Sequence, residues 1–132
     1  MSHRILLADS DQFLLDRCRE YLERRGFRVM TAATGLECVE RLRDGAPDVL
    51  VLEPSILWGG GDGVLAMMHE EPTIPRVPVI VLTYGYDRGS LYRLAPYRID
   101  DYQIKPLSAR QLAERIRVVL ASYPPAEIGI GN

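Results

Sequence analysis

Residues 48–53 read Asp-Val-Leu-Val-Leu-Glu, an uninterrupted apolar run that ends at a carboxylate. A short apolar run bounded by polar residues is typical of a strand buried on both faces, as in a parallel sheet. Similar runs occur at Ile5–Ala8, which Asp9 follows, and at Val77–Thr83, which ends at a threonine. Together these runs predict the centre of a parallel sheet.

Further strands and amphipathic helices fill the intervals around these runs. Apolar residues at helical spacing, capping boxes at Thr34–Glu37 and Ser108–Gln111, and glycines at helix ends mark the helices. The sequence predicts additional strands at 27–32 and 99–104, and helices at 11–25, 34–45, 64–68, 90–94 and from 108 onward. This alternation predicts an α/β fold, a doubly wound five-stranded parallel sheet with helices on both faces.

The bulk composition suits one soluble domain. The chain has 132 residues, of which 47% are hydrophobic and 26% charged. We expect a single domain at 1–123 and a short flexible tail at 124–132, which contains two adjacent prolines and two glycines. The net charge of -2 comes from interspersed charges, so we expect no nucleic-acid partner. Apolar segments are too short for a membrane span, and Cys18 and Cys38 lack metal or redox spacing, which favours a cytoplasmic protein.

Polar side chains stand where the predicted strands end. They are Asp9, Ser10, Asp11, Glu53, Thr83 and Lys105. The carboxyl ends of parallel strands share one edge of a sheet, so we expect these side chains to converge. Carboxylates bind magnesium, an ammonium pairs with phosphoryl oxygens, and a hydroxyl donates a further hydrogen bond. This set therefore predicts a site for a hard cation and a phosphoryl group.

The order of acidic cluster, strand-end carboxylate, Thr83 and Lys105 resembles the receiver domain of bacterial response regulators, over about residues 4–122. The resemblance implies a flavodoxin-like sheet with strand order 2-1-3-4-5. In that family, an aspartate after the third strand accepts a phosphoryl group from a histidine kinase with magnesium bound. The resemblance thus implies that Glu53 stands at the phospho-acceptor position. It also implies that Thr83 and Lys105 are the phosphoryl contacts and Tyr102 the aromatic switch residue.

Three positions depart from the family pattern. Ser10 follows Asp9 where receivers usually carry a second acidic residue that binds magnesium directly, and Glu53 replaces the aspartate. The glutamate carboxylate is one methylene further out, and in-line transfer is sensitive to displacements of that size. Tyr84 stands where a small residue usually admits the phosphodonor. We therefore expect weak magnesium binding by Asp9 and Glu53, and no required cofactor.

These departures predict an atypical receiver, not an enzyme, which acts through contacts with a signalling protein and without conventional aspartyl phosphorylation. In typical receivers the fourth helix, fifth strand and fifth helix form a partner or dimer surface. The corresponding charged residues have both signs, which suits a homodimer or a charged partner. They are Arg88, Arg93, Asp100, Asp101, Arg110, Glu114 and Arg117.

Other interpretations stay open at this point. A phosphorylatable switch would use a rearranged acidic site at Asp9, Asp11 or Asp62. A metal-dependent hydrolase or a flavin-binding enzyme ranks lower, because neither a nucleophile–base pair nor a phosphate loop is visible. Asp9 and Asp11 also suit capping of the first helix, and Glu53 also suits an ordinary solvated carboxylate.

Purely structural interpretations also exist for the residues before the third predicted helix and for the aromatic residue of the fifth strand. Gly59–Gly61 lacks a phosphate-binding pattern and predicts a flexible loop. Trp58, in the same stretch, is a candidate for a partner contact, with packing as an equal alternative. Tyr102 also fits a half-buried aromatic residue of the sheet.

Overall fold

The computed structural model describes residues 2–123. Met1 and residues 124–132 lie outside the described residues, and so does the predicted tail. The strands are β1 (Arg4–Ala8), β2 (Arg28–Ala32), β3 (Val49–Leu52), β4 (Val79–Thr83) and β5 (Asp101–Ile104). The helices are α1 (Gln12–Arg24), α2 (Gly35–Gly45), α3 (Gly60–Glu70), α4 (Arg88–Tyr92) and α5 (Ala109–Ser122).

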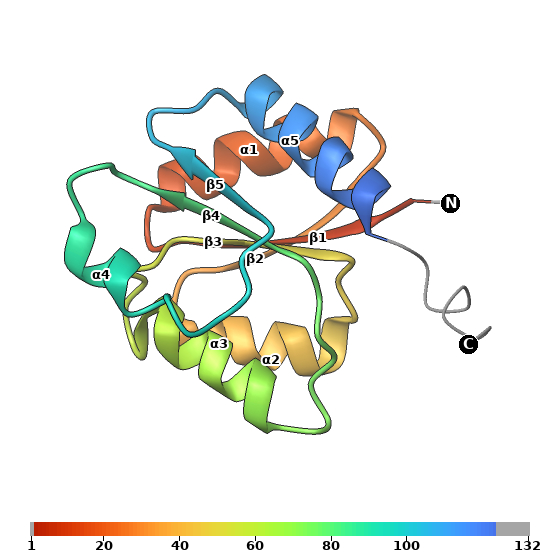
Figure 1. Cartoon of the computed structure of the whole chain (residues 1–132). Helices are drawn as coiled ribbons and strands as arrows, with labels where there is room; N and C mark the ends of the chain where they lie inside the picture. Colours follow the sequence, from red (N-terminus) through yellow and green to blue (C-terminus); the bar gives the residue numbers. More distant parts are fainter. Residues whose placement is uncertain (1, 124–132) are drawn as a thin grey trace.

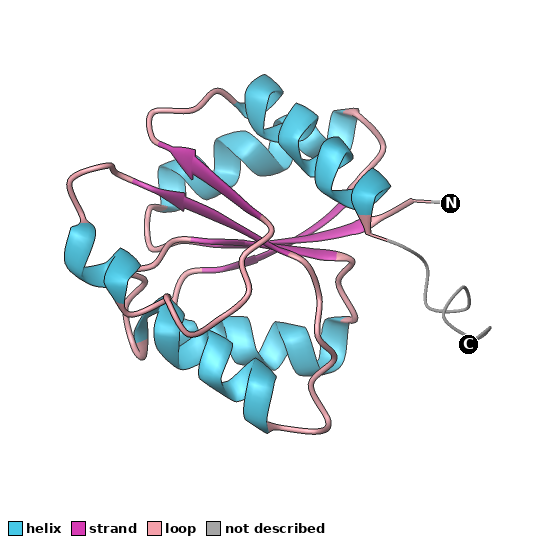
Figure 2. Ribbon diagram, viewed as in Figure 1, coloured by secondary structure: helices cyan, strands magenta, loops and turns pink. Residues whose placement is uncertain are grey.

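The five strands form one parallel sheet in the order β2-β1-β3-β4-β5. Helices α1 and α5 cover one face, while α2 and α3 cover the other, on the side where α4 also lies (Figure 1, Figure 2). The strand order reverses at β1 and β3, and in sheets of this kind the functional site typically lies outside the carboxyl ends of these strands. The predicted fold class and strand order are confirmed.

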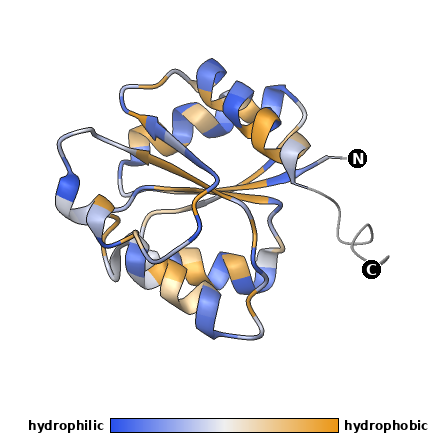
Figure 3. Ribbon diagram, in the orientation of Figure 1, coloured by the Kyte–Doolittle hydropathy of each residue, from blue (hydrophilic) through white to orange (hydrophobic). Residues whose placement is uncertain are grey.

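Alternate residues of the central strands enter two separate cores. Ile5 and Leu7 of β1 pack in the core under α1 and α5, whereas Leu6 and Ala8 pack in the core above α2 and α3. Both faces of the strand are therefore buried, which explains its uniformly apolar sequence. The hydropathy colouring shows the same pattern, with largely orange strands at the centre of the sheet between helices of mixed colour (Figure 3).

Helix ends follow the capping signals of the sequence, with one difference. At α5, Ser108 accepts from the Gln111 N–H and the Gln111 side chain accepts from the Ser108 N–H, so the capping box is complete. At α2, Thr34 accepts from the Glu37 N–H, but the Glu37 carboxylate accepts from Ala33. The acidic side chain thus reaches one residue beyond the cap, and only half of that box forms.

The prediction of a flexible glycine loop before residue 64 is wrong, because α3 begins at Gly60. Gly59 and Gly60 adopt positive φ angles of 105° and 66°, which glycine reaches without a steric penalty. Gly61 packs against the chain after β3: a Cβ there would lie 2.9 Å from the Pro54 Cα. These glycines therefore turn the chain sharply and let α3 start close to the sheet.

Both cysteines lie in the apolar cores as free thiols. Cys38 has no exposed surface, and burial raises the pKa of its thiol to about 12. This placement agrees with the lack of metal or redox spacing between the two cysteines in the sequence.

Candidate functional site

The carboxyl edge of the sheet gathers four buried polar residues from four segments. Asp9 follows β1, Glu53 follows β3, Thr83 ends β4 and Lys105 follows β5. Each is less than a tenth exposed, at 5%, 6%, 2% and 7% respectively. Charged side chains are rarely buried to this degree unless they are paired.

Lys105 joins the two buried carboxylates. Its Nζ donates to Asp9 Oδ2 at 2.7 Å and to Glu53 Oε1 at 2.8 Å. The Lys105–Pro106 peptide bond that follows is cis. We call Asp9, Glu53 and Lys105 the ion cluster.

The remaining carboxylate oxygens of the ion cluster also accept hydrogen bonds. Asp9 Oδ1 accepts from the Asp11 N–H at 2.9 Å. Glu53 Oε2 accepts from the Ser55 N–H at 3.1 Å and from the Ser55 hydroxyl at 3.0 Å. All four oxygens therefore hold protein donors, and both side chains are fixed in place.

The electrostatic balance of the ion cluster is set by burial and by close opposite charges. Burial raises the pKa of the Asp9 carboxyl by more than its hydrogen bond from Lys105 lowers it. Burial alone would lower the pKa of Lys105, but hydrogen bonds and charge from Asp9 and Glu53 outweigh it, so that pKa is raised. Lys105 is therefore held as an ammonium between two acidic groups.

Thr83 and Tyr84 lie beside the ion cluster. The Thr83 hydroxyl donates to the carbonyl of Tyr84 at 3.3 Å. The Tyr84 ring centroid lies 4.9 Å from Lys105 Nζ, and the ring stacks on Tyr86. An aromatic face at this distance attracts a cation, so Tyr84 stabilises the ammonium and stands over it.

The structure does not bring the other predicted site residues into the ion cluster. Asp11 caps α1 by accepting from the Leu14 N–H, which is the structural role that the sequence left open. The Ser10 hydroxyl contacts the backbone of Ala33 and Leu57 instead. Tyr102 is 52% exposed and does not turn inward.

A magnesium ion would compete with Lys105 at this site. The ammonium of Lys105 already binds one oxygen of each of the carboxylates of Asp9 and Glu53. Within residues 2–123, three or more His, Cys, Asp or Glu side chains do not gather in a metal-binding group. Magnesium prefers octahedral oxygen coordination, and the donors that already hold all four carboxylate oxygens would weaken its binding here.

A model of the response regulator receiver domain matches residues 5–117 of the sequence. The chain belongs to the response regulator receiver domain family. Receiver domains are signalling domains that interact with partner proteins of two-component systems, so the present receiver domain is a signalling domain too.

Curated relatives and solved structures agree with this membership. The domain is 34% identical over 116 residues to the transcriptional regulatory protein AfsQ1 of Streptomyces coelicolor, which covers 88% of this chain and 50% of that protein. It is 29% identical over 125 residues to the phosphate regulon transcriptional regulatory protein PhoB of Rhizobium meliloti, covering 95% and 55%. The chain thus spans about half the length of these relatives.

Two solved structures show the shared fold. A CheY-like receiver domain protein from Methanospirillum hungatei JF-1 superposes with a TM-score of 0.82 at 24% identity, covering 92% of this chain and 96% of that one. CheY4 of Vibrio cholerae gives a TM-score of 0.80 at 17% identity, covering 90% and 99%. At such identities the likeness concerns the fold alone.

Two polar contacts of the receiver domain were missed from the sequence. The Ser55 hydroxyl donates to Oε2 of Glu53, the oxygen that Lys105 does not bind. The sequence indicated this contact only by a hydroxyl residue two positions after a strand-end carboxylate. On the β5–α5 side, Arg115 donates to both oxygens of Asp101, at 3.0 Å each. Arg115 lies one helical turn after Gln111, and sequence spacing alone did not link it to β5.

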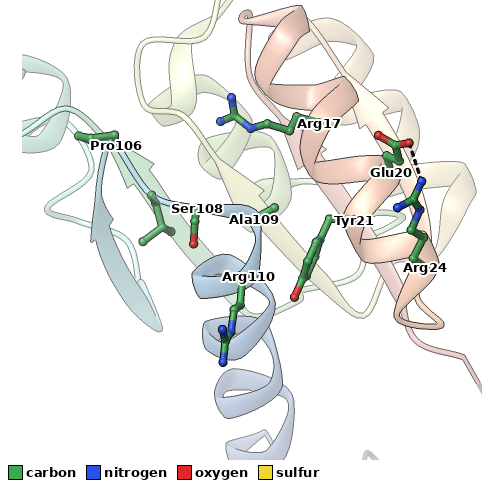
Figure 4. A pocket seen from close by; sticks show the side chains of 9 residues that line it. Arg17, Glu20, Tyr21, Arg24, Pro106, Ser108, Ala109 and Arg110 are labelled. Atoms are coloured by element: carbon green, nitrogen blue, oxygen red, sulfur yellow. Dashed lines mark hydrogen bonds and ion pairs between the residues drawn. The ribbon is translucent and has the colours of Figure 1, made fainter.

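A groove of about 650 Å³ lies between α1 and the start of α5 (Figure 4). Tyr21 and Arg24 of α1 and Arg110 of α5 line it, and Arg24 is tied to Glu20 at 3.1 Å. The ion cluster takes no part in its lining, so this groove is a separate surface feature.

None of the helices described between residues 2 and 123 is long and apolar enough to cross a membrane.

Proposed function

We propose that this is an atypical receiver domain that signals through protein–protein contacts, without conventional aspartyl phosphorylation. The observation that carries the proposal is the closed ion cluster, in which Lys105 binds Glu53 and Asp9 together. The resemblance seen in the sequence aligns Glu53 with the phospho-acceptor. A carboxylate whose two oxygens already hold Lys105 and Ser55 is poorly placed for in-line attack on a phosphodonor.

The glutamate also fails to reproduce all contacts expected of a phosphoryl group. It reaches Lys105, but the Thr83 hydroxyl donates to the Tyr84 carbonyl. Tyr102 points to solvent. A carboxylate carries less charge and one oxygen fewer than a phosphoryl group, so we propose that Glu53 holds an inactive-like arrangement.

The test is intact-mass measurement after incubation with magnesium and acetyl phosphate. We expect the wild-type domain to stay unmodified and Glu53→Asp to gain one phosphoryl group. If neither protein is modified, Ser10 and Tyr84 block the reaction as well, and the proposal stands. A phosphoryl group on the wild-type domain would overturn it, and peptide mapping would then separate Glu53 from Asp11 and Asp62.

A homodimer through α4, β5 and α5 is the proposed form of contact with a second copy. Ile104 and Val118 expose 57% and 49% of their surface on these elements. Among the charged groups, Asp101 is already paired with Arg115, and Arg110 lies 3.9 Å from Glu114. The exposed apolar side chains therefore support this surface more than the charges do.

Sedimentation velocity over a range of concentrations tests the homodimer. We expect a concentration-dependent dimer that Ile104→Glu converts to monomer, because a charge would be buried at the interface. Met67→Glu, on the exposed side of α3, is the matched control and should leave the dimer intact. A wild-type protein that stays monomeric at high concentration would exclude this dimer.

A further inference from the structure

Three large apolar side chains are exposed beside the carboxyl edge of the sheet. Leu36, Leu57 and Trp58 expose 66%, 60% and 71% of their surface. They come from α2 and from the loop between β3 and α3, and the Gly35 N–H donates to the Leu57 carbonyl at 2.7 Å. We call these three residues the Trp58 patch. Large apolar side chains that gather on a surface mark a contact region.

The backbone of the Trp58 patch is held in an unfavourable conformation. Trp58 has a positive φ of 58°, which a bulky residue adopts only where the surrounding structure enforces it. Gly35 makes room for this conformation, since a Cβ at that residue would collide with the Trp58 carbonyl oxygen. The fold therefore keeps the largest apolar side chain of the domain turned toward solvent.

Ser10 fixes the loop that carries Trp58. Its hydroxyl accepts from the Leu57 N–H and donates to the Ala33 carbonyl, both at 3.0 Å. An ionised aspartate has no proton to donate, so it would not form the bond to Ala33. The serine that departs from the receiver pattern thus joins three loops and presents the Trp58 patch.

Acidic residues are neighbours in the chain of residues that form or hold the Trp58 patch. Asp11 follows Ser10, Glu37 follows Leu36, and Asp62 lies beside Gly60 near the start of α3. Asp62 is 3.7 Å from Arg93, which only partly balances this charge. The complementary partner has an apolar side chain flanked by basic residues.

We propose that the Trp58 patch docks a partner protein segment that sets an apolar or aromatic side chain against Trp58 and flanking Lys or Arg residues near Asp11 and Asp62. Tryptophan is among the residues that contribute most to binding energy at protein interfaces. The surface is separate from α4, β5 and α5, and its use does not depend on whether Glu53 accepts phosphate. Failure of the proposed function would therefore leave this proposal standing, and the reverse also holds.

The test is selection of a random peptide library displayed on phage against the immobilised domain, with counter-selection on Trp58→Ala. Enriched peptides are synthesised with a fluorescent label, and their affinities are measured by anisotropy. We expect enriched peptides to carry an apolar or aromatic residue and net positive charge. Their affinity should fall about tenfold or more for Trp58→Ala, as for the central residue of an interface.

Two further variants separate docking from a change in the loop. Leu36→Ser leaves the strained loop untouched and should also weaken binding, whereas Met67→Ala, an exposed apolar residue further along α3, should not. Absence of enrichment, enrichment of acidic peptides, or equal affinity for Leu36→Ser and wild type would each overturn the proposal. Self-association that disappears in Trp58→Ala would also overturn it, since the occupant would then be a second copy.

Discussion

The ammonium of Lys105 lies 2.8 Å from Oε1 of Glu53, although β4 separates the strands from which the two residues follow. The lysine side chain thus passes the end of β4 to reach β3. It also binds Asp9, after β1, so one side chain ties three loops of the carboxyl edge together. The ion cluster therefore holds the loops together as well as balancing charge, and its removal should lower the free energy of unfolding of the whole domain.

Substitution Lys105→Met should destabilise the domain strongly, because it leaves two buried carboxylates without their cation. Removing one partner of a buried ion pair typically costs about 3–5 kcal/mol of the free energy of unfolding. Urea denaturation followed by circular dichroism measures the change. Arg19→Ala removes an exposed ion pair with Glu23 and should cost less than about 1 kcal/mol. Equal stability of the two variants would contradict the burial of the cluster.

The stability of the domain should depend on the Lys105 ammonium at alkaline pH. Asp9 and Glu53 outweigh burial and raise the folded pKa of Lys105 above its ordinary value of 10.5. The folded state then holds this proton more tightly than the unfolded state does. The stabilisation is complete below pH 10.5 and is lost as the pH rises through the folded pKa.

Urea denaturation at a series of alkaline pH values tests this dependence. The free energy of unfolding should fall more steeply for wild type than for Lys105→Met, because the variant lacks the titrating group. The difference between the two curves then reports the loss of the Lys105 ammonium. Parallel curves would show that the lysine has the same pKa in the folded and unfolded states.

Restoring two aspartates should strengthen magnesium binding relative to the wild-type domain. In the double variant Ser10→Asp/Glu53→Asp, one carboxylate is added and another is shortened, which opens space beside Lys105. Because magnesium affinity rises with the number of charged ligands, we expect binding at least roughly tenfold tighter than in wild type. Isothermal titration calorimetry measures it, with Glu53→Asp alone as the control. Equal affinities in all three proteins would rule out Ser10 as the missing ligand position.

Local sequence signals were sufficient for the fold. Apolar runs such as Val49–Leu52 have no polar face, so only a sheet covered on both sides could bury them. Parallel strands share one carboxyl edge, and this topology brings Asp9, Glu53 and Lys105 together. Their chemical role, which the resemblance suggested, stays a prediction.

The loops that join these elements were less predictable, because their contacts depend on backbone angles and side-chain rotamers. Ser10 and Asp9 are adjacent in sequence, yet one faces the Leu57 loop and the other faces Lys105. Likewise, a glycine-rich sequence alone does not show whether the glycines form a flexible loop or allow two backbone segments to pack closely. Residue 61 must lack a Cβ because Pro54 packs against it, and only the three-dimensional structure shows this contact.

The role of these glycines can be tested with a matched pair in α3. Gly61→Ala places a Cβ 2.9 Å from the Pro54 Cα, and the backbone must shift to accept it. We expect it to lower the free energy of unfolding by about 1–3 kcal/mol, as overpacking usually does. At Gly63 a Cβ meets nothing within 4 Å, so Gly63→Ala should raise it by about 0.5–1 kcal/mol through helix propensity. Urea denaturation of both variants decides the matter. Equal stabilisation by the two alanines would mean that Gly61 is chosen for flexibility, as the sequence first suggested, and not for contact with Pro54.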